Sequence, residues 1–374
     1  MEVGRFNVLI GENGCGKSNI LEAITFAAAA EANKLDNEFL VSRGIRVTEP
    51  ELMRSGFESK NSIKDIKIAM GFSHFLFPYT LKNNNTPYSK WIFHERYQEN
   101  IEFDQFYDKV KKSNIDLTKF EKGTALSCNE EYEDTLESIN VEKFFRDKNK
   151  INNFIIYSPE NTSLRTFSKE GQIQPLGING EGLLKLLKVI QQQSAQSEQD
   201  VTPLDDIKEC LALFDWYESI DISSDFAQAE QKINIKDRYL ENVFDQRSAN
   251  EGFLFVLFYI ALMVSEDTPK IFAIDNIDAS LNPKLCTKLI KELTRLAKKY
   301  GKQVFVTTHN PAILDGIDLA DDEQRLIVVS RNKQGYTRCK RIELKDKPKS
   351  STDEPLKLSE AFLRGYLGGL PKGF

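Results

Sequence analysis

An eight-residue loop near the N-terminus has the residue types needed to hold a phosphate group. The stretch Gly11-Glu-Asn-Gly-Cys-Gly-Lys-Ser18 fits the pattern G-x-x-x-x-G-K-[ST] without a mismatch. In this pattern the glycines let the backbone approach the phosphates, the lysine reaches the β- and γ-phosphates, and the hydroxyl sits on Mg²⁺. We therefore expect the following residues to bind a nucleotide: Gly11, Glu12, Asn13, Gly14, Cys15, Gly16, Lys17, Ser18 and Asn19.

The segments on both sides of this loop are typical of a phosphate cradle. Residues 6–10 predict a short buried strand, and residues 19–30 predict a helix. A glycine loop between a strand and a helix N-terminus directs its amides and the helix dipole at an anion, which argues against a chance glycine loop. Asn33-Lys-Leu-Asp36 resembles a guanine-reading motif, but it follows the first helix and not a later strand, so we predict adenine.

A second group of polar residues lies at the ends of two apolar runs. Lys270-Ile-Phe-Ala-Ile-Asp275 predicts a strand that ends in a carboxylate, and Asp275 could bind Mg²⁺ together with Ser18. Residues 303–308 predict another buried strand, with His309 directly after it. Since ligands gather at the carboxyl ends of parallel strands, His309 could donate to a γ-phosphate or orient water.

Two predicted helices begin with residues that could be caps or ligands. Asn250, Glu251 and Gly252 precede a run of apolar residues that ends at Val264. Asn is a good N-cap and Gly permits close approach, so the triplet alone is a weak signal and a helix cap is the plainer interpretation. Asn282-Pro283 starts the next helix, as N-cap and first residue. Its basic residues predict a solvated face: Lys284, Lys288, Lys291, Arg295, Lys298 and Lys299.

The composition excludes several classes of protein. The chain has 374 residues, which suggests about two domains, and its net charge of −6 gives no overall argument for nucleic-acid binding. Five scattered cysteines favour a reducing cytosol over a disulfide framework or a zinc site, and three histidines exclude a His-rich metal centre. The longest apolar run, residues 253–264, is too short to cross a bilayer, so we expect a cytoplasmic protein without a signal peptide.

The middle of the chain has weaker signals. We interpret Arg43, Arg46 and Arg54 as part of a solvated loop, with a nucleotide- or partner-facing role as the alternative. The other expected segments are antiparallel hairpins at 63–72 and 88–97 around a turn at 82–87, polar helices over 101–148, a strand at 153–157, a helix at 180–192, further helices over 204–240, a strand at 326–329 and a terminal helix from 358.

The order of these motifs resembles the ABC-type ATPase head of SMC, RecF and OLD-like proteins, and is most similar to the compact anti-phage ATPases of the Septu and PARIS type. The resemblance rests on the cradle, a long insertion, N-E-G before a buried helix, the apolar run to Asp275, the Asn-Pro helix and T-T-H-N. It implies an α/β P-loop NTPase with a mainly parallel sheet, an antiparallel β part and an inserted helical lobe. The expected parts are 1–100 and 241–345 for the ATPase head, 101–240 for the inserted lobe and 346–374 for a helical tail.

The resemblance also implies roles for the residues that match. In such heads two copies dimerise, or form a higher oligomer, around ATP and Mg²⁺, and each signature caps the nucleotide in the other cradle. Asn250–Gly252 stands in the place of the signature, and residues 280–283 in the place of the segment that crosses the dimer interface. Asp275 stands in the place of the Mg²⁺-side aspartate, and His309 in that of the switch histidine.

Three departures affect these roles. Asn250 replaces the usual serine of the signature, and no glutamine follows the cradle before Gln98. Asn276 occupies the position of the catalytic glutamate, and an amide cannot accept a proton from the attacking water. Losing a general base typically costs about 10²- to 10⁴-fold in rate, although Asp278 could substitute. We therefore predict a slow or partner-dependent ATPase whose catalytic residues are Asp275, Asn276, Asp278 and His309.

The functional hypothesis is an ATP-driven head that controls a separate effector chain, a nuclease or toxin, in phage defence. Outside the ATP site the sequence has no HNH-type histidine pair and no acidic cluster. A RecF-like DNA-repair ATPase, with nucleic acid as partner, is one alternative. A non-hydrolysing ATP-sensing switch is another, favoured by Asn276. A transporter ATPase is more distant, because that class should have an L-S-G-G-Q motif.

Overall fold

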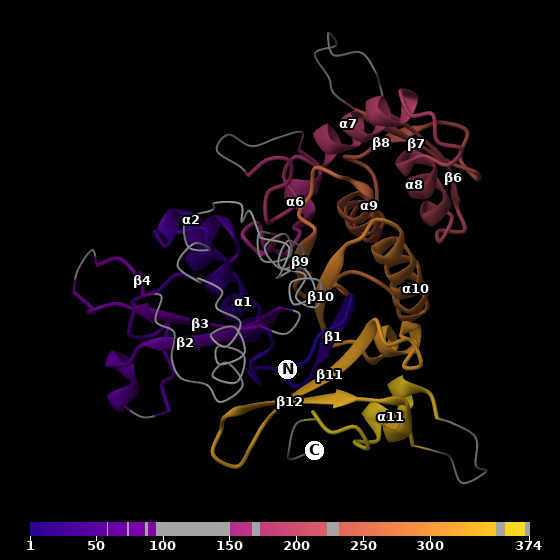
Figure 1. Ribbon diagram of the computed structural model, residues 1–374. Helices are drawn as coiled ribbons and strands as arrows, with labels where there is room; N and C mark the ends of the chain where they lie inside the picture. The colour runs from indigo at the N-terminus through magenta and orange to yellow at the C-terminus, as the bar shows by residue number, and fades with distance from the viewer. Residues whose placement is uncertain are drawn as a thin grey trace, which may run out of the picture. The chain divides into compact units, whose positions relative to one another are not determined.

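The chain forms two compact units, which are described separately (Figure 1). The structure is a computed structural model, and it describes residues 1–57, 59–72, 75–86, 89–94, 150–166, 173–222, 232–348 and 356–370. Unit 1 contains residues 1–25, 40–46 and 153–374, and unit 2 contains residues 26–39 and 47–152. The helices expected over residues 101–148 lie outside the described residues.

Unit 1 is built on a six-stranded sheet that is parallel except at one edge. Its strand order is β12-β11-β1-β10-β9-β5, and only β12 runs antiparallel to its neighbour. The strands are β1 (Phe6–Ile10), β5 (Ile156–Tyr157), β9 (Ile271–Ile274), β10 (Gln303–Thr308), β11 (Gln324–Arg331) and β12 (Thr337–Ile342). This arrangement confirms the prediction of an α/β fold with a mainly parallel sheet.

Both faces of the inner strands β1 and β9 are buried, which explains their continuous apolar runs. All five residues of β1 and all four residues of β9 are buried. The last residue of β1, Ile10, pairs with Thr308 of β10, and Ile274 of β9 pairs with Val306 of β10. The carboxyl ends of β1, β9 and β10 therefore meet at one edge, where residues 11, 275 and 309 begin their loops.

Three helices carry the strongest sequence signals and form as expected. These helices are α1 (Lys17–Glu31), α9 (Glu251–Val264) and α10 (Pro283–Lys299). From Gly252 onward every residue of α9 is buried, as its uninterrupted apolar run predicts. Asn250 and Asn282 are both N-caps, whose side-chain oxygens accept from the backbone N–H groups of Phe253 and Leu285 at 2.8 and 2.9 Å.

The segment between β5 and α9 contains a second sheet as well as helices. Its elements are α6 (Asn161–Leu164), α7 (Leu183–Ala195), α8 (Pro203–Leu211), β6 (Tyr217–Ile222), β7 (Ile233–Asp237) and β8 (Phe244–Asp245). The helix expected over 180–192 is confirmed as α7. The prediction of helices throughout residues 204–240 is wrong beyond Leu211. There β6, β7 and β8 form a three-stranded antiparallel sheet.

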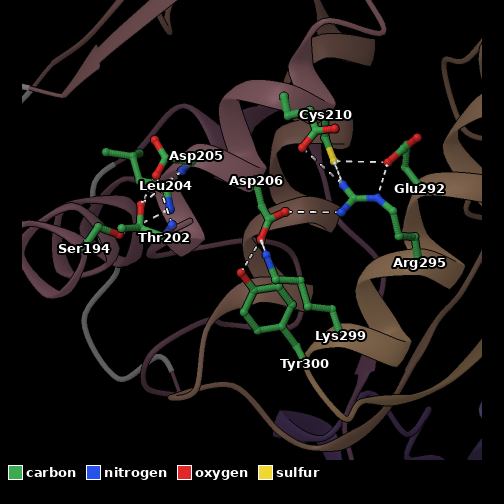
Figure 2. A network of polar contacts seen from close by, with 11 residues as sticks. Ser194, Thr202, Leu204, Asp205, Asp206, Cys210, Glu292, Arg295, Lys299 and Tyr300 are labelled. Atoms are coloured by element: carbon green, nitrogen blue, oxygen red, sulfur yellow. Dashed lines mark hydrogen bonds and ion pairs between the residues drawn. The ribbon is translucent and has the colours of Figure 1, made fainter. Parts of the chain in front are cut away.

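A buried carboxylate joins α8 to α10 (Figure 2). Asp206, which is 1% exposed, accepts from Lys299 Nζ at 2.6 Å and Arg295 Nη1 at 3.3 Å, and also from the hydroxyl of Tyr300. Burial alone would raise the pKa of Asp206, but these three hydrogen bonds hold it below its ordinary range. Arg295 and Lys299 on the expected solvated face of α10 are exposed as predicted, but they also form ion pairs that the sequence did not indicate.

Unit 2 contains a small antiparallel sheet of order β2-β3-β4. Its elements are η1 (Ser59–Ile63), β2 (Ile66–Phe72), β3 (Phe75–Lys82) and β4 (Ile92–His94), while α2 (Asn37–Ser42) spans the boundary between the units. Antiparallel hairpins were expected here, and β2 pairs directly with β3, from Ile66 opposite Leu81 to Phe72 opposite Phe75. The segment 82–87 therefore connects β3 to β4 and not β2 to β4.

The sequence suggested that Arg54 is part of a solvated loop, but the structure shows that this residue is buried. Its guanidinium donates to the carbonyls of Pro50, Lys64 and Asn83 at 2.6–2.8 Å and lies 4.9 Å from the ring centroid of Trp91. This buried arginine therefore connects three backbone segments of unit 2. Burial lowers the pKa of its guanidinium.

The C-terminal part of unit 1 contains η4 (Pro311–Gly316), η5 (Leu344–Asp346) and α11 (Leu358–Leu363). The expected terminal helix is thus present but short. Among the described helices, none has the length and apolar character needed to cross a membrane.

Candidate nucleotide site

The glycine loop connects β1 to α1 and packs closely against two other strands. An added Cβ at Gly11 would lie 2.0 Å from the carbonyl oxygen of Val329 on β11, so no side chain fits there. At Gly16 the φ of 108° favours glycine, and a Cβ would lie 2.5 Å from the hydroxyl of Thr337 on β12. The Thr337 hydroxyl donates to the Cys15 carbonyl at 2.8 Å, so β12 anchors the loop from outside.

The Lys17 side chain is hydrogen-bonded to the glycine loop. Its Nζ donates to the carbonyl oxygens of Gly11 at 2.9 Å and Glu12 at 3.1 Å. Burial lowers the pKa of Lys17, opposed by the nearby Cys15, Asp275 and Asp278. The helix begins at Lys17, two residues earlier than predicted, and therefore the N–H groups of its first turn lie within the cradle motif. Asn13 and Gly14 at the tip of the loop are exposed.

A cluster of hydroxyls surrounds Asp275 at the end of β9. The Ser18 hydroxyl donates to Asp275 Oδ2 at 3.2 Å, and the Thr307 hydroxyl at the end of β10 donates to Oδ1. These are hard oxygen ligands of the kind that Mg²⁺ prefers. Among the described residues, no group of three or more His, Cys, Asp or Glu side chains could hold a metal ion. A cation at Asp275 would therefore depend on phosphate oxygens and water for its remaining ligands.

Asn276 and Asp278 follow Asp275 in a turn that is fastened to β10. Asn276 has a φ of 54°, and its backbone N–H donates to the Thr307 hydroxyl at 2.9 Å. Asp278 Oδ1 accepts from the Thr308 hydroxyl at 2.6 Å and from the backbone N–H of His309 at 3.4 Å. The Asp278 carboxylate thus already holds the end of β10 in place.

His309 is exposed at the end of β10, close to the other polar groups of the site. Burial lowers its pKa below the ordinary 6.5, Lys17 lowers it further, and Asp278 and Asp275 act in the opposite direction. This shift favours the neutral imidazole, which can act as either a donor or an acceptor. The structure thus brings Lys17, Ser18, Asp275 and His309 together at one edge of the sheet, as the sequence predicted.

The Asn250–Gly252 triplet lies in a different environment. An added Cβ at Gly252 would lie 2.9 Å from the carbonyl oxygen of Ser280, so this glycine lets the start of α9 pack on the turn before α10. Between described residues, no hydrogen bond links the triplet to residues 11–18. Within one chain, the triplet is therefore a helix cap and a packing contact.

The comparison with family models adds an independent observation. The family described as "AAA domain, putative AbiEii toxin, Type IV TA system" matches residues 6–207 and 213–315, which is most of the chain. This chain belongs to that family. It is therefore a P-loop ATPase domain of the AAA family, and its matched region includes the cradle, Asp275 and His309.

Solved structures show where else this fold occurs. The ATPase domain is similar to an Smc head bound to the C-winged helix domain of ScpA, with 14% identity, 91% of each chain covered and a TM-score of 0.52. At that identity the likeness shows a shared fold alone. It also matches Smc heads from Pyrococcus furiosus, with 16% identity and a TM-score of 0.43, and Thermotoga maritima, with 11% identity and a TM-score of 0.39, each over 91% of both chains. No curated protein matches the sequence significantly.

Sequence reasoning missed the residue that fixes the loop before α9. Arg165 donates to the carbonyl oxygens of Gln246, Arg247 and Ala249 at 2.6–2.8 Å. Its Nε donates to Asn161 Oδ1 at 2.8 Å, which orients the guanidinium. About 80 residues separate Arg165 from this loop, and no local motif could have indicated the contact.

The structure adds contacts with α1 to the interpretation of Arg46 as a solvated residue. Its guanidinium binds both carboxylate oxygens of Glu22, at 2.6 and 3.2 Å, and Asn19 Oδ1 at 3.1 Å. Asn19 of α1, expected to contact the nucleotide, therefore already has Arg46 as a hydrogen-bond partner. Arg46 itself remains 67% exposed, in agreement with the solvated interpretation.

Proposed function

We propose that this ATPase domain binds ATP and Mg²⁺ between two copies of the chain and hydrolyses ATP slowly. The observation that supports this most strongly is the cluster at the carboxyl ends of β1, β9 and β10. There Lys17 lies in the glycine loop, while the Ser18 and Thr307 hydroxyls meet the Asp275 carboxylate. His309 completes the cluster at the end of β10, where burial and the charge of Lys17 lower the pKa of its imidazole.

Each residue has a role that follows from its position. Lys17 would leave the Gly11 and Glu12 carbonyls to pair with the phosphates, and Ser18 and Asp275 would hold Mg²⁺. Bound Mg²⁺ supplies positive charge that neutralises the phosphates. Asp278 would fix the end of β10, and His309 would orient water or donate to the γ-phosphate.

The second copy would supply its own Asn250–Gly252 triplet to the nucleotide. Asn250 is exposed, although its side chain caps α9, so its amide nitrogen and the adjacent backbone can meet a ligand from outside the chain. Arg165 supports this proposal because it orders the loop that precedes the triplet. The dimer, or a higher oligomer, is part of the proposal.

We further propose that the ATPase controls a separate effector, a nuclease or toxin, in bacterial phage defence of the Septu or PARIS type. The family description, which names a toxin of a toxin–antitoxin system, supports a defence role. The described residues contain no group of three or more His, Cys, Asp or Glu side chains that could hold a metal ion, and we assign the effector activity to another chain. Co-purification from the native operon tests this point, and recovery of the chain alone would contradict it.

Nucleotide binding is the first test of the proposal. Calorimetric titration with ATP should show binding that needs Mg²⁺ for full affinity in the wild type. Lys17→Ala should lose binding, while Asp275→Asn should keep ATP binding but lose its dependence on Mg²⁺. A wild-type chain that binds no ATP at millimolar concentration would refute the proposal.

A non-hydrolysing switch is the second candidate, and Asn276 is the observation that favours it. An amide at this position cannot take the proton of the attacking water, and Asp278 already accepts two hydrogen bonds. In that case ATP would be bound and released unchanged, with turnover supplied only by a partner.

A further inference from the structure

The hairpin formed by β11 and β12 has a strongly one-sided charge. Residues 324–342 contain six basic residues and no acidic residue, in a chain whose net charge is −6. The basic residues are Arg325, Arg331, Lys333, Arg338, Lys340 and Arg341. Such a local excess of one sign creates a positive potential that attracts polyanions. We name residues 329–340, the outer part of this hairpin, the basic ribbon.

The positive charge is neutralised at the base of the hairpin, whereas three cations of the ribbon have no ion-pair partner among the described residues. Arg325 pairs with Asp322 at 3.2 Å, and Arg341 pairs with Glu2 at 3.0 Å and with Asp322 at 3.4 Å. In contrast, Lys333, Arg338 and Lys340 are exposed and form no ion pair with any residue that the structure describes. Three cations are therefore available at the outer end.

The basic ribbon extends beyond the end of β1, the strand that pairs with β11 in the sheet. β11 pairs with β1 only as far as Val328, whereas β11 and β12 remain paired out to Arg331 opposite Thr337. Figure 1 shows the turn of this hairpin projecting away from the sheet. In the described residues β12 has no neighbour on its other side. A projecting two-stranded ribbon has the width that fits the major groove of duplex DNA.

Two cations of the ribbon, Arg338 and Lys340, lie on the face of β12 away from the cradle. Side chains alternate along a strand, so Arg338 and Lys340 point to the side opposite Thr337. Thr337 is fixed by its hydrogen bond to the Cys15 carbonyl, which holds the ribbon in position. Arg338 and Lys340 are two residues apart on an extended strand, about 7 Å, and lie opposite Ser330 and Val328.

We propose that the basic ribbon binds the phosphate backbone of duplex DNA. An acidic protein that added a strand to the edge of β12 is the competing partner. Lysine and arginine on an edge strand oppose strand addition, whereas they favour contacts with phosphates. This proposal does not depend on the ATPase mechanism, because the contact needs no nucleotide.

The test compares two charge-matched variants by fluorescence anisotropy, with a labelled 24-base-pair duplex of mixed sequence, low salt and no nucleotide. The ribbon variant combines Lys333→Gln, Arg338→Gln and Lys340→Gln. The control combines Lys288→Gln, Lys291→Gln and Lys298→Gln, which removes the same charge from the exposed face of α10. Circular dichroism melting of both variants checks that they remain folded, since all six side chains are exposed.

The ribbon variant should bind the duplex at least tenfold more weakly than the wild type, while the control should match the wild type. The slope of log affinity against log salt should fall by about 3 in the ribbon variant, since each phosphate contact contributes about 0.9. No binding by the wild type, or an equal loss in both variants, would overturn the proposal. Competition by polyglutamate as strong as that by unlabelled duplex would also overturn it, in favour of an acidic protein.

Discussion

Asn276 combines a rare backbone conformation with a side chain that cannot act as a base. Its φ of 54° lies in the left-handed region, which asparagine adopts more easily than glutamate. The backbone of the turn therefore gives a structural reason for asparagine here, in addition to any effect on catalysis. A substitution that restores a carboxylate must tolerate this conformation.

If a missing base limits turnover, Asn276→Glu should raise the rate of ATP hydrolysis at least tenfold, because glutamate can accept the proton of the attacking water. Asn276→Gln is the matched control, since it has the same length and the same backbone penalty but no carboxylate. Steady-state phosphate release measures both. Equal rates in the two variants would show that the missing carboxylate does not limit turnover.

Lys302 provides a test of electrostatics away from the site. Its buried Nζ donates to the Ser265 carbonyl at 2.7 Å and to the Thr268 hydroxyl at 2.8 Å, next to the end of α9. Burial lowers the pKa of Lys302 to about 7, while in the unfolded chain it stays near the ordinary 10.5. Between these values the unfolded state binds the extra proton, so Lys302 makes the free energy of unfolding increase with pH.

The free energy of unfolding of the wild type should therefore increase between pH 7 and 9 relative to that of Lys302→Met. The difference in slope should be at most about 1.4 kcal/mol per pH unit, the value for one proton. Urea titrations of both proteins at several pH values measure it. Parallel pH dependences would mean that Lys302 keeps its proton when folded.

At the scale of single residues, the chemistry of the site was predictable only where it followed a local motif. The cradle, Asp275 and His309 lie at the ends of strands that their apolar runs reveal. Thr307 was read as part of a strand, and its contact with Asp275 depends on the pairing of β9 with β10. Arg54 and Arg165 bind backbone carbonyls, which leave no pattern in the sequence.

At the scale of elements, the link between α8 and α10 makes a prediction about stability. Asp206→Asn should lower the free energy of unfolding by about 3 kcal/mol, because it removes the negative partner of Arg295 and Lys299, which are each 39% exposed. Glu209→Gln on the same helix is the control. Its carboxylate is 70% exposed and 3.9 Å from Arg295, so a change below about 0.5 kcal/mol is expected.

Urea unfolding at pH 7 measures both variants, and equal effects would contradict a special role for Asp206. The sign of the pH dependence gives a further check. Because the folded pKa of Asp206 is lowered, its stabilisation is present above its unfolded pKa and is lost as pH falls through the folded pKa. Asp206→Asn should therefore lose less stability on acidification than the wild type.

The elements that sequence reasoning found are those with long or uniform apolar patterns. α9 is buried along its length and α10 is amphipathic, so both were predicted with their caps. β6 and β7 were missed, because their short alternating runs, with Ile220 and Ile222 facing Ile235 and Ile233, were read as helix. β3 contains Pro78, which weakens a strand pattern, and it was overlooked within the expected hairpins.

At the scale of the whole molecule, the sequence predicted the fold class but not the order of the strands. β1, the first strand in the chain, lies inside the sheet between β11 and β10, which are formed about 300 residues later. The two units also alternate along the chain, since residues 26–39 and 47–152 of unit 2 lie between segments of unit 1 in the sequence. Such long-range pairings depend on the packing of the complete chain, for which no local signal exists.

Sedimentation velocity with and without ATP and Mg²⁺ tests most directly whether ATP joins two copies of this ATPase, as we propose. We predict a monomer of 42.8 kDa without nucleotide and about twice that mass with ATP, while Lys17→Ala stays a monomer in both conditions. A wild-type chain that binds ATP, as shown by calorimetry, and keeps the same mass would contradict the account.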